Sequence, residues 1–237
     1  MAERLEAVET PLGRLEVAVA LARCWLALTG VFPFDTTVRL LVAQSALETG
    51  WWEHCRAYNL GNIKGAAGDG RDWCFFPCNE VLTWEQASRL IAGAPQRPDG
   101  EGKAAAVDHA ATSARTARLG LDDGRVVVQF WPDHPAARFR AFRTLDDGMR
   151  DHLDFLRGQA RFAAALAAAA AGDTAGFVRG LKAGGYFTAD ETAYRATLDG
   201  VLKLLGPLPW REELERQAAL AAYAVQVPIA NEQPEGR

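Results

Sequence analysis

Hydrophobic positions along this chain recur mainly at helical spacing. Leu15, Val19 and Leu26 lie on one face of a segment that spans residues 13–29. Gly30 follows this segment as a stop signal. The same reasoning predicts further helices at residues 35–49, 83–92, 145–156, 159–171, 173–182 and 210–225. One more helix is expected to begin after a cap at Thr188 or Asp190 and to end near residue 205.

Short segments in the middle of the chain have β-type patterns instead. Residues 126–131 form the clearest strand, residues 138–143 predict a second, and a short strand is expected near residues 73–76. Residues 93–124 are rich in Gly, Ala, Pro and Asp, which indicates an insertion, and we expect a helix over residues 104–117. The whole pattern predicts a mainly helical protein with a small β element in its middle.

Composition and charge narrow the class of protein. The 237 residues suit one large domain, or a domain with an appendage. The net charge of -4 and the lack of a basic stripe exclude a nucleic-acid partner. No apolar run is long enough to span a bilayer. The N-terminus begins with acidic residues, so we expect no secretory signal and synthesis in the cytoplasm.

Glu48 is the first candidate for chemistry. It lies at the C-terminal end of the predicted helix over residues 35–49, where the helix dipole is negative, and Trp51 and Trp52 follow at once. A negative dipole end and the exclusion of water both favour the protonated form of a carboxyl group. That is the form that a general acid needs. The alternative is an ordinary surface glutamate near a helix end.

Glu48 belongs to a series of four motifs. In order they are Ala43-Gln-Ser-Ala-Leu-Glu-Thr-Gly-Trp51, Tyr58-Asn-Leu-Gly-Asn-Ile-Lys-Gly65, Phe139-Arg-Ala-Phe-Arg143 with Asp151-His-Leu-Asp-Phe-Leu156, and Lys182-Ala-Gly-Gly-Tyr186 with Tyr194. The series resembles the bacterial autolysin and flagellar-type β-N-acetylglucosaminidase family over roughly residues 15–205. Four motifs in the right order are much more specific than one.

The resemblance implies a fold and two carboxyl groups. The implied fold is mainly α (α+β, lysozyme-like), with helical lobes around a substrate groove and a small β-hairpin on one rim. Glu48 would be the proton donor and Glu80, on the hairpin, the second acid. The sequence departs from the family pattern at Cys78, where threonine is usual, and by the insertion over residues 93–124. The weaker rivals of Glu80 are Glu85, Asp122 and Asp123.

The loop after Glu48 supplies further candidates for substrate binding. Asn59 and Asn62 lie among turn glycines, where their side chains either hold the loop or bind an N-acetyl group. Lys64 either meets a carboxylate of a peptide stem or is solvated. Trp51 either stacks on a sugar or fills the core.

Two tyrosines complete the list of binding candidates. Tyr186 follows two glycines, and the resemblance puts it beside the catalytic acid, whereas the alternative is a packing aromatic. Tyr194, in the closing helix, fits a structural role better than a binding role.

No metal or cofactor is expected. Cys74 and Cys78 resemble a cysteine pair that the family often has, and they would form a disulfide only in an oxidising compartment. The cysteine and histidine spacings do not match a zinc site.

The resemblance, together with the position of Glu48, implies a glycoside hydrolase that cuts the β-1,4 bond after N-acetylglucosamine in a peptidoglycan glycan strand. One alternative is a muramidase or lytic transglycosylase on the same glycan. Another is a wall-binding component of a phage-tail-like assembly, without catalysis. We expect a catalytic domain over residues 1–205, and a helical extension over residues 206–237 that binds an assembly or delivery partner. The enzyme would then reach the cell wall by non-classical delivery.

Overall fold

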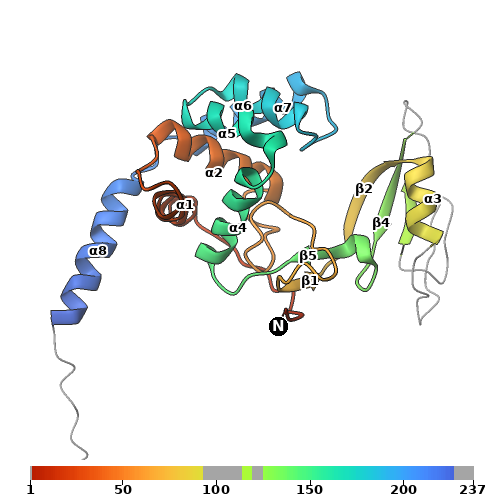
Figure 1. The fold of residues 1–237 in the computed structure, drawn as a ribbon, viewed down its shortest axis with the longest axis horizontal. Coiled ribbons are helices and arrows are strands. Elements are labelled where there is room, and N and C mark those ends of the chain that lie inside the picture. Colours follow the sequence, from red (N-terminus) through yellow and green to blue (C-terminus); the bar gives the residue numbers. More distant parts are fainter. Residues whose placement is uncertain (1, 93–113, 119–124, 227–237) are drawn as a thin grey trace, which may run out of the picture. The chain divides into compact units, whose positions relative to one another are not determined.

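The computed structural model describes residues 2–92, 114–118 and 125–226, which form two compact units (Figure 1). The helices are α1 (Arg14–Thr29), α2 (Asp35–Thr49), α3 (Trp84–Ala92), α4 (Leu145–Arg157), α5 (Ala163–Ala170), α6 (Thr174–Ala183), α7 (Glu191–Leu205) and α8 (Trp210–Gln226), with 3-10 turns η1 (Pro135–Ala137) and η2 (Ala160–Phe162). The strands are β1 (Trp73–Phe75), β2 (Cys78–Thr83), β3 (Ala114–Arg118), β4 (Arg125–Phe130) and β5 (Arg138–Arg140).

The first unit comprises the described residues of 1–12 and 45–155, and it contains both sheets. Strands β1 and β5 pair antiparallel, with Cys74 opposite Phe139. The second sheet is antiparallel in the order β2-β4-β3, and Glu80 lies opposite Val128. Half-buried and exposed residues alternate along β2, so Glu80 shares its face with Cys78.

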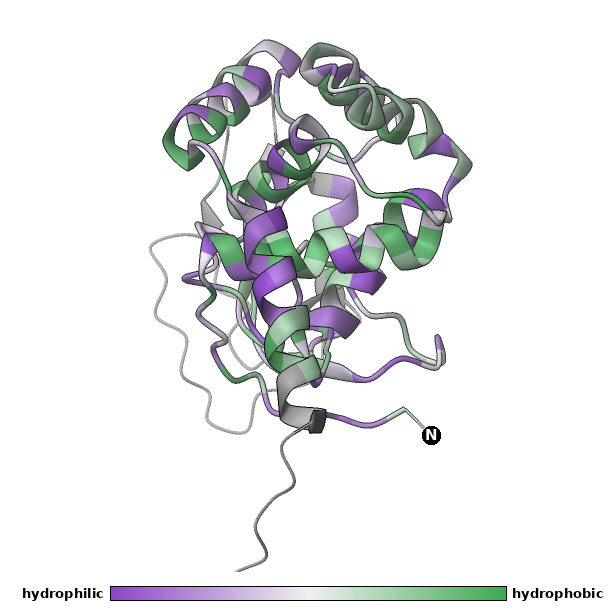
Figure 2. Cartoon of the chain, turned by 90° about the vertical axis from the view of Figure 1, so that its left-hand side faces the viewer, coloured by the Kyte–Doolittle hydropathy of each residue, from purple (hydrophilic) through white to green (hydrophobic). Residues whose placement is uncertain are grey.

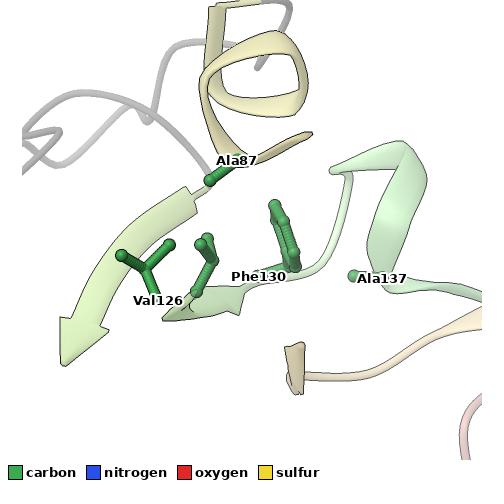
Figure 3. Close-up of a cluster of buried hydrophobic side chains, with 5 residues drawn as sticks. Ala87, Val126, Phe130 and Ala137 are labelled. Atoms are coloured by element: carbon green, nitrogen blue, oxygen red, sulfur yellow. The ribbon is translucent and has the colours of Figure 1, made fainter. Parts of the chain in front are cut away.

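Two apolar clusters hold these sheets. In the first, Ala87 of α3 packs against Val126, Val128 and Phe130 of β4, close to Ala137 (Figure 3). The amphipathic face of α3 thus covers one side of the three-stranded sheet. The second cluster lies around the two-stranded sheet and is made of Ala57, Cys74, Phe76, Phe139 and Ala141.

The second unit comprises the described residues of 13–44 and 156–237, and it is helical. Helix α6 packs closely on α5, and a Cβ added at Gly180 would lie only 2.5 Å from the backbone nitrogen of Ala165. Asp190 caps α7 by accepting a hydrogen bond from the backbone of Ala193. Helix α8 contacts α1, and Figure 2 shows that its first turns are hydrophilic. None of the described helices has the length and apolar character that a bilayer span requires.

The structure confirms the predicted fold class, which is mainly α with small antiparallel sheets. The predicted helices and strands are observed with shifts of a few residues at their ends, and the β part is larger than a single hairpin. The expected helix over residues 104–117 is wrong at its end, because Ala114–Arg118 forms strand β3. Pairing with β3 supplies hydrogen-bond partners to the backbone groups along the edge of β4, and this gain outweighs the helix propensity of alanine. The remainder of this predicted helix, residues 104–113, lies outside the described residues.

The predicted domain boundary at residues 205 and 206 falls where α7 ends at Gly206, whose φ is +64°. The compact units divide the chain elsewhere, within α2 between Gln44 and Ser45. The division into a catalytic domain over residues 1–205 and an extension over residues 206–237 stays a prediction.

Candidate active site

Glu48 lies in the last turn of α2, one residue before the helix ends. Its side chain is half-buried. Trp51 and Trp52 follow, and their indole rings meet edge to face with centroids 6.2 Å apart. Trp52 is buried, whereas Trp51 is half-buried. Glu48 therefore occupies the negative end of a helix dipole, just before two aromatic side chains.

Side-chain hydrogen bonds fix the turn that follows Glu48. Trp51 and Trp52 have left-handed backbone angles, with φ of 58° and 64°, which are uncommon for bulky residues. The indole nitrogen of Trp52 donates to the Ser45 hydroxyl at 3.0 Å, and that hydroxyl donates to the carbonyl of Leu60 at 2.8 Å. The surrounding packing thus compensates for the backbone strain of the turn.

The two asparagines of the loop bind backbone groups. The Asn62 amide donates to the carbonyl of Glu48 at 2.6 Å, which ties the end of α2 to the loop. Asn59 is buried and makes three bonds: its amide donates to the carbonyls of Ile63 and Arg140, and its oxygen accepts from the Ile63 nitrogen. Asn59 thus joins the loop to the strand β5.

A cavity of about 540 Å³ lies between this loop and the strand β2. Its wall combines aromatic, polar and charged side chains. The lining residues are His54, Arg56, Asn62, Lys64, Phe76, Pro77, Cys78, Asn79, Glu80 and Phe139. Three of the candidates from the sequence, Asn62, Lys64 and Glu80, are therefore brought together in one cavity.

Lys64 and Glu80 form an ion pair in this cavity. The Lys64 ammonium lies 2.7 Å from a carboxylate oxygen of Glu80, and it donates to the carbonyl of Ala136 at 2.7 Å. It also donates to the Cys78 sulfur at 3.1 Å. The Glu80 side chain is 34% exposed, so a ligand in the cavity has access to it. Lys64 therefore balances the charge of the carboxylate that the sequence suggests as second acid.

The cysteines near Glu80 are free thiols. Cys74 is buried, and burial raises its pKa to about 11. Burial also raises the pKa of the Cys78 thiol, although the Lys64 ammonium lowers it in part. Both thiols therefore stay protonated near neutral pH, which makes them weak nucleophiles.

The structure also locates the rivals of Glu80 and the remaining candidates. Glu85 is exposed on α3 and pairs with Arg89, while residues 122 and 123 lie outside the described residues. Tyr186 and Tyr194 belong to the second compact unit. The Tyr186 hydroxyl accepts a hydrogen bond from the Gln44 amide at 2.7 Å, and Tyr194 stacks on Phe187.

A buried polar cluster lies behind the loop. The Asp151 carboxylate accepts hydrogen bonds from Arg71 at 2.8 Å and from Arg140 at 2.7 Å. His152 next to it is buried, and burial lowers its pKa to about 4 against the opposing charge of Asp151. His152 also abuts Gly61, where an added Cβ would lie 2.6 Å from the ring. The cluster thus supports the loop from its inner side.

The sequence analysis did not single out Arg56, which lines the cavity, and it considered His54 only as a member of a zinc site. The signal for them is weak but present, since these basic residues flank Cys55 in the loop that follows the candidate acid. Among the described residues, no three His, Cys, Asp or Glu side chains come together in a way that would hold a metal ion.

This chain is similar to a known protein family and to several solved structures. The family model described as mannosyl-glycoprotein endo-beta-N-acetylglucosaminidase (Glucosaminidase) matches residues 34–206. The sequence has no significant match among curated proteins. Similar solved structures include a peptidoglycan hydrolase mutant from Sphingomonas sp. A1 (21% identity, 84% of this chain and 93% of that chain covered, TM-score 0.43). Another is the glycoside hydrolase domain of FlgJ from Salmonella typhimurium (18% identity, 90% of this chain and 97% of that chain covered, TM-score 0.43). A third is the catalytic domain of the autolysin Auto from Listeria monocytogenes (13% identity, 84% of this chain and 88% of that chain covered, TM-score 0.42).

Proposed function

This chain belongs to the glucosaminidase family of glycoside hydrolases, and from that premise we propose that it cuts the β-1,4 bond after N-acetylglucosamine in peptidoglycan. The observation that carries the proposal is the family match over residues 34–206, which spans both Glu48 and Glu80. We assign peptidoglycan as the substrate because the four sequence motifs resemble those of wall-cleaving autolysins.

Glu48 is the general acid of the proposed reaction. Hydrolysis of a glycosidic bond needs a carboxylic acid that protonates the leaving oxygen. The position of Glu48 supports this role, since it is half-buried at the carbonyl end of α2 and precedes two tryptophans. The hydrogen bond from Asn62 to its carbonyl holds the backbone of the acid in place.

Glu80 is the second acid, and Lys64 keeps its charge balanced. A carboxylate near the sugar ring stabilises the positive charge that develops as the bond breaks, or it activates water. The accessible position of Glu80 in the cavity supports such a role. In the first compact unit, the side chains that would bind the sugar are Asn62, Lys64 and Trp51. The structure gives less support to the further binding candidates, which are Tyr186, Tyr194 and Asn59.

The decisive test of the acid is Glu48→Gln, which keeps the shape of the side chain but removes its proton. We expect the loss of nearly all clearing of cell walls in a zymogram, with an unchanged unfolding transition. The matched control is Glu53→Gln, because Glu53 is an exposed glutamate five residues further along the chain. Clearing by the Glu48 variant at wild-type strength would refute the assignment.

The bond that is cut separates the alternatives. A reducing N-acetylglucosamine end in the released muropeptides indicates the proposed glucosaminidase. A reducing muramic acid end indicates a muramidase, and an anhydro-muramic end indicates a lytic transglycosylase, for which Glu80 is dispensable. Mass spectrometry of a digest distinguishes the three products. Binding to sacculi without any released sugar would instead favour a wall-binding component.

The C-terminal extension is proposed as the attachment site for an assembly or delivery partner that brings the enzyme to the cell wall. The family match ends at residue 206, and α8 follows it with mostly exposed side chains after Trp210. The 237-residue chain and a variant that ends at Arg211, which keeps the buried Trp210, should clear purified walls equally, whereas only the 237-residue chain should retain its partner in a pull-down from its own cells.

A further inference from the structure

Two cations and two aromatic rings form one wall of the cavity. Phe76 and Phe139 stack with centroids 3.8 Å apart. The Lys64 ammonium lies over the Phe139 ring at 3.9 Å, and the Arg56 guanidinium lies over the Phe76 ring at 5.8 Å. All four side chains line the cavity, so any ligand there meets two positive charges on an apolar floor.

Each of these cations holds one carboxylate. Lys64 pairs with Glu80, which is itself part of the cavity lining. Arg56 pairs at 2.8 Å with Glu9, which comes from the N-terminal segment and does not line the cavity. A second guanidinium nitrogen donates to the carbonyl of Ala7 at 3.2 Å. The Ala7 carbonyl thus holds Arg56 in the cavity wall, whereas its carboxylate partner, Glu9, lies outside the cavity lining.

The pair of Arg56 and Glu9 is suited to exchange. The Glu9 side chain is 61% exposed and that of Arg56 30% exposed. An exposed ion pair contributes little to stability, so the loss of Glu9 from Arg56 costs little. The fork of a guanidinium matches any carboxylate in geometry. A ligand carboxylate in the cavity would therefore compete well with Glu9.

The charge of the cavity favours an acidic ligand. The lining contains Arg56 and Lys64 as permanent cations against Glu80 as the one acid among the lining residues, so one positive charge of the lining is balanced only by Glu9, from outside it. The chain as a whole carries a net charge of -4, so this local surplus of positive charge is not a bulk property. A neutral sugar polymer carries no negative charge that could pair with this positive charge.

We infer that Arg56 is a binding site for a carboxylate of the saccharide substrate, which displaces Glu9 from the guanidinium. The inference rests on the proposed function and specifies its substrate as a glycan that bears carboxylates. In peptidoglycan two groups have this chemistry: the lactyl group of muramic acid once its peptide is removed, and the acidic residues of the peptide stem.

Three preparations of the same glycan strands separate these sources. The first carries peptide stems, the second is stripped by an amidase and has free lactyl carboxylates, and the third is the stripped strand after conversion of its carboxylates to methylamides. We expect Arg56→Gln to raise KM about tenfold on a strand whose carboxylate it binds, as for the loss of a hydrogen bond to a charged group. The preference of the wild type for that strand over the methylamide should disappear. An effect on stripped strands identifies the lactyl group, and one confined to stem-bearing strands identifies the stem.

Glu9→Gln gives an effect of opposite sign. It removes the competing carboxylate, so KM for the acidic strand should fall by about threefold relative to the wild type, in line with the small worth of an exposed pair. The matched control is Arg4→Gln, because Arg4 also pairs with an exposed acid, Asp133, and lies over an aromatic ring, that of Trp73, but does not line the cavity. Its kinetics should equal those of the wild type.

Equal changes on acidic and methylamide strands would overturn the inference and leave Arg56 a structural residue. A rise in KM with Glu9→Gln would overturn it as well, and this measurement holds even if Arg56→Gln does not fold. A wild-type enzyme that cuts none of the strands would instead refute the proposed function, so the two failures are distinguishable.

Discussion

The segment that follows Glu48 and the sheet that carries Glu80 belong to the same compact unit, but different interactions hold them. Residues 49–65 adopt several left-handed backbone angles and are fixed by buried hydrogen bonds from Trp52 and Asn59. Glu80 lies on a regular strand and is held by a partly exposed ion pair with Lys64.

This difference separates stability from chemistry. Removal of a buried polar or aromatic group leaves a cavity or unsatisfied partners, and both destabilise the folded state. Removal of an exposed ion pair changes the local charge but little else. We therefore expect substitutions in the segment of residues 49–65 to act mainly on the free energy of unfolding, and substitutions at the pair to act mainly on catalysis.

Trp52→Ala should have the largest effect on stability. Truncation of a buried tryptophan lowers the free energy of unfolding by about 3–5 kcal/mol, and here the Ser45 hydroxyl also loses a donor. Urea unfolding at pH 7 measures the change. Trp51→Ala is the matched control, and its loss should be clearly smaller because Trp51 is half-buried. Equal losses for the two tryptophans would show that burial does not distinguish them.

The buried His152 should make stability depend on pH. Its pKa is about 4 in the folded state, below the ordinary value of 6.5, so the unfolded chain binds a proton that the folded chain does not. Its contribution is therefore fully present above about pH 6.5 and declines as the pH falls toward 4, by about 3 kcal/mol in total.

Urea unfolding between pH 4 and 7 tests this slope. In His152→Gln the part of the slope that comes from this residue should vanish, even if the variant is less stable at every pH. His54→Gln is the matched control, because it is the same substitution at an exposed histidine. A wild-type slope that His152→Gln leaves unchanged would assign the pH dependence to other groups.

The two regions also differ in how far the sequence predicts them. The end of α2 follows from local signals, namely the apolar spacing from Val38 to Leu41 and the stop at Gly50. The left-handed angles of Trp51 and Trp52 do not, because buried partners distant along the chain impose them. A local sequence pattern does not show which distant residues become such partners.

The sheet was harder to predict because its pairing is non-local. Ala114–Arg118 has the composition of a helix, yet it forms β3 beside β4. The pair of Lys64 and Glu80 joins residues 16 positions apart, on a loop and on a strand, and only the folded register brings them to 2.7 Å. The resemblance implies Glu80 as the second acid and the loop after Glu48 offers Lys64 as a binding candidate, but their contact with each other has no signal in the sequence.

Asn59→Ala should lower the free energy of unfolding by about 2–3 kcal/mol, because it leaves the carbonyls of Ile63 and Arg140 and the Ile63 nitrogen without this partner. The same substitution in the sheet, Asn79→Ala, is the matched control. Asn79 is exposed on β2, so its loss should be below about 0.5 kcal/mol. The contrast between the two regions fails if Asn79→Ala destabilises as much as Asn59→Ala.

Lys64→Met should have the smallest effect on stability and still reduce activity. The Lys64 side chain is 42% exposed, so loss of its pair with Glu80 should change the free energy of unfolding by less than about 1 kcal/mol. On the proposed mechanism, kcat/KM should fall by about tenfold, because the sugar loses a charged binding group and the Glu80 carboxylate loses the partner that holds it in place. Lys64→Arg keeps the positive charge and should restore part of the activity. A loss of stability as large as that of Asn59→Ala, with activity that Lys64→Arg does not restore, would make Lys64 a structural residue and remove the distinction between the two regions.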